Sequence, residues 1–232
     1  MLIAHDLALD DTYEGKGKPL TFFLVPLTSP GVDTISVSKI GQRLIPTAEI
    51  ILDNVRVPAS AVMGQRGDGG AVLLSSYEYG RVYVCATSVG MAESAMEQAA
   101  LYAHHHKISG SSIVSFQQIQ ELLTDMQVKV DAMRALLYKT AWELDSNADH
   151  IRLDTSLLKR FVPKAAMEVA DSAMQIMGNI AYISTSRVGR IWQECRGNRL
   201  AEGTDQIMTL VAGKRIAQRA QDEIKSRPSW RF

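Results

Sequence analysis

The sequence has no excess of charge of either sign. Its 232 residues include 25 basic and 25 acidic side chains, so the formal net charge is +0. Proteins that attract nucleic acid or anionic membrane surfaces over a distance usually carry a basic excess. The balance therefore indicates neither kind of partner, and we expect no nucleic-acid binding.

Cysteines and long apolar runs are also scarce. Cys85 and Cys195 lack the spacing of a metal or redox motif, which favours free thiols in a reducing compartment. No window reaches the roughly 20 apolar residues of a membrane span. The first residues do not show the basic stretch and apolar run of a signal peptide. We therefore expect no membrane span, and a cytoplasmic location, or the mitochondrial matrix if the source is eukaryotic.

Motifs for a metal or a phosphate group are missing as well. His104, His105 and His106 are adjacent, and adjacent side chains on a helix point about 100° apart, so the three cannot converge on one ion. Residues 65–70 (QRGDGG) match neither a P-loop nor GxGxxG. We expect no metal site, and a flexible entry to the first helix instead of a phosphate loop.

Strand-like patterns fill the first part of the chain. Residues 20–26 (LTFFLVP) are a short apolar run, 35–40 (ISVSKI) alternate apolar and polar, and 49–58 (EIILDNVRVP) predict a strand that leads into a turn. At most four strands are visible, and so small a sheet has exposed edges that need cover. Residues 1–68 are therefore predicted to be part of a larger antiparallel β-domain.

Helical patterns follow from residue 69. They predict helices over 71–106, up to Asn147, over 154–177 and over 204–225, with an irregular segment at 180–200 and a tail at 226–232. Asp154 is predicted to cap the third helix, and Pro163 predicts a kink or a later start. Four long helices with short connections favour an antiparallel four-helix bundle over 69–225. The predicted fold class is mainly α with a small β segment.

The second helix has the clearest amphipathic pattern. Its apolar residues recur at spacings of three and four: Ile119, Leu122, Leu123, Met126, Val130, Met133 and Leu137.

A carboxylate stands where the irregular segment meets the last helix. Glu202 is followed by Gly203 and by Thr204, a hydroxyl residue suited to cap a helix. A lone carboxylate at such a place is most often solvated and complements the helix dipole. A general base is the other reading, because the side chain would be presented at the mouth of the helix. The residues alone leave both open.

Three blocks of sequence together resemble the flavin-dependent acyl-CoA dehydrogenase family. Residues 23–58, with FLVP, PGV and DNVRVP, look like the end of that family's middle β-domain. Residues 80–117, with Gly-Arg at the start and Phe-Gln at the end, look like its first two bundle helices. Residues 175–204, with QIMG and RxxRxxEGT, look like its closing motifs. The resemblance implies the end of the middle domain and the C-terminal bundle, without the N-terminal domain.

What the resemblance implies is α,β-dehydrogenation of an acyl-CoA thioester in fatty-acid metabolism, with FAD as cofactor. Glu202 falls on the family's usual position for the base that removes the α-proton, while the β-hydrogen leaves as hydride to FAD N5. Some members carry the base immediately before the arginine of the first bundle helix. Here that position is Gly80, which cannot serve, so one base position is filled and the other is vacant.

The resemblance also implies the roles of other residues. Five match positions that contact FAD, in part across a subunit interface: Gln117, Gln175, Gly178, Thr204 and Gln206. Three match positions that bind the acyl-CoA substrate: Glu78, Arg81 and Gly203. The implied assembly is a homo-oligomer, a dimer or tetramer, and the implied electron acceptor is an electron-transfer flavoprotein.

One departure from the family pattern keeps an alternative open. The family usually has Arg-x-x-Phe-Gly before Phe116 and Gln117, where this chain has residues 106–110 (HKISG). Loss of a permanent cation weakens FAD binding unless Lys107 or a protonated His106 replaces it. The alternative is a truncated, non-catalytic subunit that assembles with a full-length or N-terminal-half homologue. An unrelated bundle whose motifs match by chance is the third reading.

Overall fold

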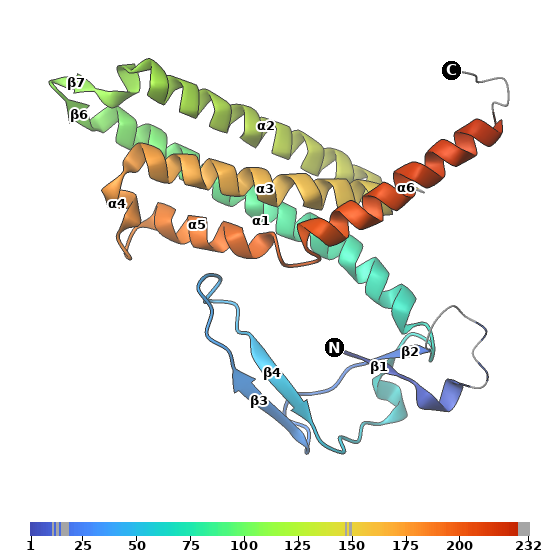
Figure 1. Ribbon diagram of the computed structural model, residues 1–232. Helices are drawn as coiled ribbons and strands as arrows, with labels where there is room; N and C mark the ends of the chain where they lie inside the picture. The colour runs from blue at the N-terminus through green and yellow to red at the C-terminus, as the bar shows by residue number, and fades with distance from the viewer. Residues whose placement is uncertain (11, 13, 15–18, 147, 149, 227–232) are drawn as a thin grey trace. The chain divides into compact units, whose positions relative to one another are not determined.

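The computed structural model describes residues 1–10, 12, 14, 19–146, 148 and 150–226. The chain divides into two compact units, Met1–Tyr77 and Glu78–Phe232. Figure 1 gives the order of the helices and strands in the two units. Within the described ranges, no helix is both long enough and apolar enough to cross a membrane.

The first unit contains two small antiparallel sheets. Strands β1 (Leu2–His5), β2 (Leu20–Phe23) and β5 (Val62–Met63) form a three-stranded sheet with β2 in the middle. Strands β3 (Val32–Ser36) and β4 (Ala48–Leu52) form a two-stranded sheet. Short 3-10 turns accompany them in the same unit: η1 (Leu7–Leu9) and η2 (Ala59–Ala61).

The strands agree in part with the sequence patterns. β2 lies within the predicted run 20–26 but is shorter. β4 lies within the predicted run 49–58, except that it begins one residue earlier at Ala48, and it is also shorter. β3 ends at Ser36, where the predicted strand 35–40 had only begun, and β1 had no prediction at all. The described strands therefore form only small sheets, and a sheet of two or three strands keeps unpaired edges.

The side chain of Asp6 ties the β-sheet to the segment that enters the first helix. Its carboxylate accepts hydrogen bonds from Arg66 at 2.8 and 2.6 Å and from the Thr21 hydroxyl at 2.9 Å. The Thr21 oxygen in turn accepts from the Gly67 N–H at 3.0 Å. A Cβ at Gly69 would lie 2.6 Å from the Leu20 carbonyl oxygen, so the close approach of the two backbones requires glycine there.

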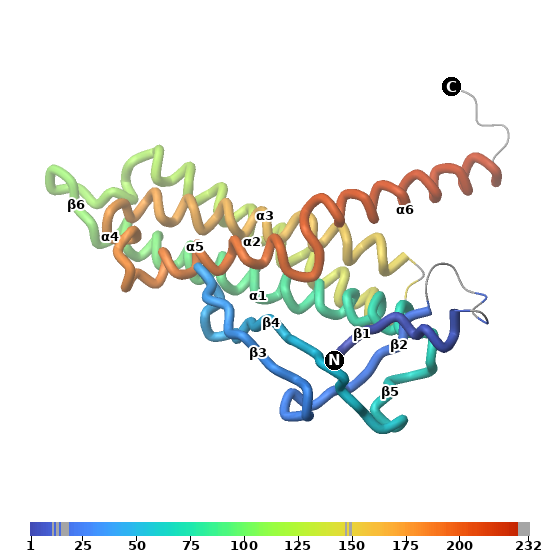
Figure 2. Tube along the Cα trace, turned by 60° about the horizontal axis from the view of Figure 1, so that its bottom comes forward, coloured from blue at the N-terminus to red at the C-terminus, as the bar shows by residue number. Residues whose placement is uncertain are grey.

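Long helices make up the second unit. α1 (Gly69–His105), which begins in the first unit, is followed by α2 (Gln117–Asp145), α3 (Ile151–Met177) and α6 (Asp205–Ser226). α3 packs against α2, α6 and the shorter α5 (Arg187–Asn198), and Figure 2 shows it among them. This arrangement confirms the predicted mainly α fold with a helical bundle.

The core of the bundle follows the sequence spacing. α1 contributes a stripe of buried, mostly small residues to this core: Cys85, Val89, Ala92, Ala95, Ala99 and Ala103. The predicted apolar stripe of α2 is buried at Met126, Val130 and Met133, and its remaining members pack against this core. Spacings of three and four residues place such side chains on one helix face.

A hairpin and a short helix connect the long helices at one end of the bundle. β6 (Lys107–Ile108) and β7 (Ser111–Ser112) pair between α1 and α2. Ser109 and Gly110, the two residues of the turn, have φ of 51° and 83°, as a tight two-residue hairpin requires. η3 (Ile113–Ser115) follows the hairpin, and α4 (Asn179–Tyr182) follows α3.

Residues 180–200 were predicted to be irregular, and this prediction was wrong. α5 occupies most of the segment, and the Ser186 hydroxyl accepts a hydrogen bond from the Gly189 N–H at 3.2 Å as its N-cap. Val188, Ile191 and Cys195 are buried at helical spacing. The N-cap serine and this spacing were visible in the sequence, but the glycines at 189 and 197 obscured them.

α3 also differs from its prediction. It begins at Ile151, so Asp154 lies in its first turn and does not cap it. The helix runs through Pro163 without a break, and Pro163 is buried. Tertiary packing of the buried face outweighs the one backbone hydrogen bond that proline removes. The predicted tail begins at Ser226, the last residue of α6; residues 227–232 lie outside the described part of the chain.

Candidate active site around Glu202

The turn between α5 and α6 has an unusual backbone. Glu202 has φ of 54° and Gly203 has φ of 107°, so two consecutive residues are left-handed. For a residue with a side chain this conformation costs about 1–2 kcal/mol. Residues held in such conformations occur preferentially at functional sites. A Cβ at 203 would also lie 2.6 Å from the methyl group at the end of the Met208 side chain, which would have to shift.

The carboxylate of Glu202 lies against the backbone of α1 at Gly80. A Cβ at Gly80 would be 2.6 Å from Glu202 Oε2, 2.7 Å from its Cδ and 3.2 Å from its Oε1. Any side chain at position 80 would therefore displace the carboxylate. In the sequence, the glycine at 80 and the glutamate at 202 are separate observations. In the structure they are connected, because the carboxylate of Glu202 occupies the space that a side chain at position 80 would need.

Two buried cations hold the carbonyl groups of this turn. Arg81 Nε donates to the Glu202 carbonyl oxygen at 3.4 Å, and its guanidinium group also donates to Ser156 Oγ at 3.5 Å. Lys159 Nζ donates to the Gly203 carbonyl oxygen at 3.1 Å. Arg81 is only 6% exposed and Lys159 is 0% exposed. Each of the two left-handed residues thus has its carbonyl oxygen bonded to a basic side chain.

Burial also changes the acid–base properties of Lys159. It lowers the pKa of this ammonium group, while Cys85, Asp205 and Glu202 act in the opposite direction and Arg81 adds to the lowering. In water a lysine keeps its proton far above neutral pH, but loss of hydration disfavours the charged form. The buried position of Lys159 therefore disfavours the charged form of its side chain.

The start of α6 is fixed by an ion pair and a cap. Arg199 Nε donates to Asp205 Oδ2 at 2.9 Å, and its Nη2 bonds to the same oxygen. Thr204 Oγ1 accepts from the Ile207 N–H at 3.4 Å, the contact expected of the predicted capping hydroxyl, and its carbonyl accepts from the Met208 N–H at 3.0 Å. These bonds fix the direction in which the chain leaves Glu202.

Glu78, predicted to line the substrate channel, is paired within the bundle. Its Oε1 accepts from Arg152 Nε at 3.1 Å. The Arg152 carbonyl accepts from Ser156 Oγ, which in turn contacts Arg81. Glu78, Arg81, Gly203 and Glu202 therefore belong to one polar network on α1, α3 and the α5–α6 turn.

The residues predicted to contact FAD do not converge in one chain. Thr204 and the exposed Gln206 lie beside Glu202 at the start of α6. Gln117 begins α2, while Gln175 and Gly178 lie at the end of α3, at the end of the bundle where α1 finishes (Figure 1). At 1.5 Å per residue, α1 runs on the order of 35–40 Å from Gly80 to that end. The two sets are therefore far apart within a single bundle.

Lys159, Ser156 and Arg152 were missed in the sequence. All three lie on α3, where Lys159 sits between the buried residues Leu158 and Val162. A charged residue inside an apolar stripe is a visible signal, since such residues are almost never fully buried without a partner. The partner itself, a backbone carbonyl 44 positions along the chain, could not be inferred from spacing.

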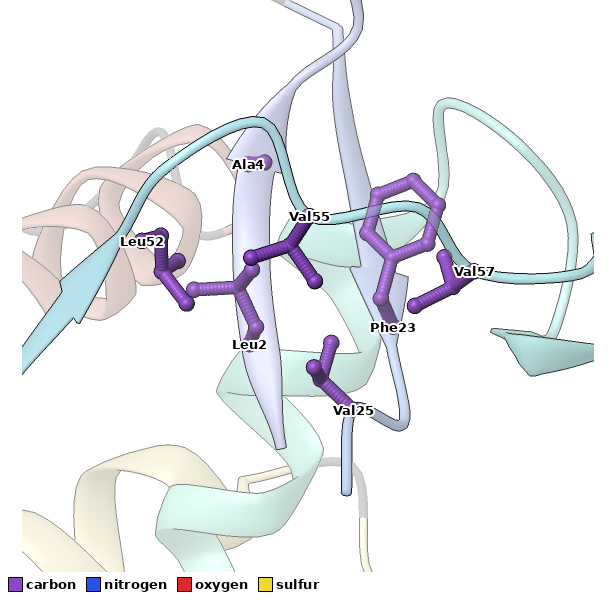
Figure 3. A pocket seen from close by; sticks show the side chains of 7 residues that line it. All are labelled: Leu2, Ala4, Phe23, Val25, Leu52, Val55 and Val57. Atoms are coloured by element: carbon purple, nitrogen blue, oxygen red, sulfur yellow. The ribbon is translucent and has the colours of Figure 1, made fainter. Parts of the chain in front are cut away.

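An apolar pocket and a cluster of two carboxylates and a histidine were considered as alternative sites. The first unit has an apolar pocket of about 270 Å³ whose lining side chains carry no titratable group (Figure 3): Leu2, Ala4, Phe23, Val25, Leu52, Val55 and Val57. Within the described ranges, Glu143, His150 and Asp154 are close enough to share an ion. Lys139 already bridges the two carboxylates, at 2.8 Å from Glu143 and 3.0 Å from Asp154.

Comparison with known proteins identifies the family of the chain. Residues 67–217 match the family model described as acyl-CoA dehydrogenase, C-terminal domain. The probable acyl-CoA dehydrogenase YdiO of Escherichia coli K12 is 37% identical over 217 residues, which are 94% of this chain and 56% of that protein. The chain spans about half the length of the curated relatives it matches.

Solved structures give the same result. An acyl-CoA dehydrogenase of Slackia heliotrinireducens is 40% identical with a TM-score of 0.81, over 90% of this chain and 55% of that one. Butyryl-CoA dehydrogenase of Megasphaera elsdenii is 28% identical with a TM-score of 0.85, over 93% and 55%. The motifs quoted from the sequence, the helical bundle and these matches agree, and the chain belongs to the acyl-CoA dehydrogenase family.

Proposed function

We propose that this chain supplies the catalytic bundle of an enzyme that dehydrogenates an acyl-CoA thioester between its α and β carbons, with Glu202 as the base. The observation that carries the proposal is the Glu202 carboxylate, seated over Gly80 by a left-handed turn. Family membership supports the class of reaction, because relatives such as butyryl-CoA dehydrogenase are named for it.

The chemistry explains why such a base must be held firmly. The α-proton of a thioester is far too weakly acidic for a freely moving carboxylate in water. Correct placement of a base contributes by avoiding the entropy loss of bringing the groups together. In this chain the turn, Gly80 and the bonds from Arg81 and Lys159 fix where the carboxylate lies. The Glu202 carboxylate is the group that we expect to receive the proton.

The chain also has groups that suit FAD. Gln117 and Gln175 are exposed, and neither makes a side-chain hydrogen bond within the described ranges, so their amides are free to donate and accept. Phe116 provides no side-chain cap for α2, and its carbonyl accepts from the Ile119 N–H at 3.0 Å. Within the described ranges the N–H groups of Gln117 and Gln118 have no backbone partner, so they are the ones that suit an anionic group. Bound FAD would accept the β-hydrogen as a hydride. Gln117, Gln175 and Gly178 would hold its adenosine and pyrophosphate end, and Thr204 and Gln206 would contact it near Glu202.

The separation of these two sets favours an oligomer. Because one bundle keeps Thr204 and Gln206 far from Gln117 and Gln175, we propose that a cofactor beside Glu202 reaches its remaining partners on a second subunit. A dimer or tetramer of this chain, or an assembly with a longer homologue, would provide it. One similar structure, at 28% identity, is described as an electron-transferring flavoprotein of Acidaminococcus fermentans. We propose an electron-transfer flavoprotein as the electron acceptor, as the family resemblance implies.

Replacing Glu202 by glutamine in the assembled, FAD-loaded enzyme tests the proposal. Glutamine keeps the size of the side chain but cannot accept the proton. Loss of a general base typically costs about 10²–10⁴-fold in rate. We expect losses of this order both in exchange of the α-proton with D₂O and in bleaching of the flavin band at about 450 nm by an acyl-CoA.

The matched control is Glu97→Gln, the same change at an exposed position of α1. It should leave both rates unchanged. Undiminished exchange and bleaching in Glu202→Gln would contradict the assignment of the base.

A non-catalytic subunit is the second candidate function. The observation that favours it is the segment His106–Gly110, which replaces the family's arginine and lies in an exposed hairpin. In this case the chain assembles with a longer homologue and carries no flavin of its own. The amount of bound flavin in the purified assembly, compared with the number of copies of each chain, decides between the two. The first candidate requires one flavin for each copy of this chain, whereas in the second the flavin count matches the longer homologue alone.

A further inference from the structure

We propose that Lys159 is a positioning residue, whose hydrogen bond to the Gly203 carbonyl fixes the left-handed turn that holds Glu202 over Gly80. Its effect on catalysis rests on the proposed function of Glu202. Its effect on the turn does not, and can be measured without substrate or cofactor.

The burial of Lys159 calls for an explanation. The side chain is 0% exposed and lies in the apolar face of α3. Removing an ammonium group from water is costly unless hydrogen bonds compensate for the lost hydration. The hydrogen bond that the structure gives to Nζ leads to the Gly203 carbonyl, at 3.1 Å. The long, unbranched side chain thus connects α3 to the turn between α5 and α6.

The turn in question has no regular structure to hold it. Glu202 and Gly203 lie between the end of α5 and the start of α6, and both have positive φ. Since Glu202 is not a glycine, the ordinary backbone preference would return it to the right-handed region. Bonds to the carbonyls of these two residues, from Arg81 and from Lys159, oppose that return. Loss of Lys159 would leave the Gly203 carbonyl without this donor, and unpaired buried acceptors are unfavourable.

The electrostatic surroundings fit a positioning role. Asp205 and Glu202 favour the charged form of Lys159, whereas burial and Arg81 oppose it. Both a charged ammonium and a neutral amine carry N–H groups, so the bond to Gly203 persists in either state. Lys159 acts on the backbone of the turn, and Glu202 remains the group that meets the substrate.

Lys159→Met tests the proposal, because methionine keeps most of the side-chain length and removes the donor. Hydrogen exchange of the chain without substrate, followed by mass spectrometry, reads out residues 199–210. The amides of Ile207 and Met208 bond to Thr204 and report directly on the turn. We expect these amides to exchange about tenfold faster or more, while peptides from the core of α2 keep their rates.

Lys164→Met is the matched control. It makes the same substitution on the same helix, at an exposed lysine that lies 3.9 Å from Glu168. It should leave exchange at 199–210 unchanged. Lys159→Gln is a second variant in case the methionine does not fold. Its amide is too short to reach Gly203 from the same backbone position, so it should loosen the turn in the same way.

The assembled enzyme gives a readout that a merely structural lysine would not move. With Lys159→Met we expect α-proton exchange to fall about 100-fold, the loss associated with misplacing a reacting group by about 1 Å. Acyl-CoA affinity should change by less than about threefold, because Glu78 and Arg81, the other two residues predicted to bind the substrate, are unchanged in this variant.

Unchanged exchange at 199–210, or faster exchange spread evenly over the bundle, would overturn the role of Lys159. The proposed function fails separately, if Glu202→Gln keeps its proton exchange while Lys159→Met still loosens the turn.

Discussion

The two ends of the bundle hold their polar groups in opposite ways. The turn end is defined by Glu202, Gly203, Arg81 and Lys159, and there the charged side chains of Arg81 and Lys159 are buried and donate to the backbone. At the glutamine end, defined by Gln117, Gln175 and Gly178, the residues are exposed, and the two amides make no side-chain hydrogen bond within the described ranges.

This contrast separates two tasks. A group that must remove a weakly acidic proton benefits from a fixed position before the substrate arrives. Groups that hold a cofactor supplied from outside need open donors and acceptors until it binds. We infer that the turn end is organised within one chain, and that the glutamine end becomes organised only when a cofactor and a second subunit meet it.

Gly80→Ala breaks the turn end with the smallest possible change. The added Cβ would lie 2.6 Å from Glu202 Oε2, too close to be tolerated, so the carboxylate must move. Since a displacement of about 1 Å costs on the order of 100-fold in rate, α-proton exchange in the assembled enzyme should fall by about that factor. Isotope exchange measured by mass spectrometry, with saturating acyl-CoA, checks the result.

Gly90→Ala is the control for this change. It lies ten positions further along the same helix, and a Cβ there would meet nothing within 4 Å. It should stabilise the fold by about 0.5–1 kcal/mol, as alanine does in a helix, and leave the exchange rate alone. Equal rates in the two alanine variants would show that Glu202 is not held against Gly80.

Gly203→Ala and Gly178→Ala compare the two ends by their free energies of unfolding. Both glycines have positive φ, of 107° and 62°, so alanine is strained at either position. Only at Gly203 does the new Cβ also meet a neighbour, the Met208 methyl group at 2.6 Å. We expect Gly203→Ala to cost about 1–2 kcal/mol more than Gly178→Ala, because overpacking adds to strain. Urea unfolding measures the difference, and equal costs would mean that the turn end is no tighter than the glutamine end.

The sequence predicted the parts of this site that local rules control. The hydroxyl of Thr204 caps α6, the stripe of α2 faces the core, and Glu202 stands at the mouth of the last helix. Each depends on residues within a few positions of one another, where spacing and capping preferences apply.

The parts that were missed depend on contacts between distant segments. The bond from Lys159 to Gly203 joins positions 44 apart, and the seat of Glu202 on Gly80 joins α1 to the end of α5. Positive φ at Glu202 is likewise imposed by its surroundings, since a glutamate on its own prefers other conformations. No local pattern carries that information, and only the folded chain supplies it.

Alkaline titration sharpens the comparison through two buried thiols, whose pKa values differ between the folded and the unfolded chain. Burial raises the pKa of both thiols, Cys85 and Cys195, from 9.0 to about 12. Between these values the folded protein keeps protons that the unfolded chain has lost, so stability falls as the pH rises through this range. We expect each thiol to account for a loss of about 1 kcal/mol between about pH 8 and pH 10.

Cys85→Ala isolates the thiol that lies next to Lys159. Its free energy of unfolding should fall less steeply with pH than that of the unchanged chain, although alanine itself lowers stability at every pH by leaving a small cavity. Chemical denaturation at a series of pH values gives the two slopes. Parallel slopes would mean that Cys85 does not keep its proton to higher pH when folded.

The glutamine end should give the smallest effect on stability. Gln117→Ala and Gln175→Ala remove exposed amides that make no side-chain hydrogen bond within the described ranges, so each should change the free energy of unfolding by less than about 0.5 kcal/mol. If these amides hold FAD, the same variants should weaken its binding, which a flavin titration of the assembled enzyme measures. A variant that loses stability but keeps its flavin affinity would contradict the assignment of that glutamine to FAD binding. The glutamine end would then be part of the scaffold, and the cofactor would need another set of partners.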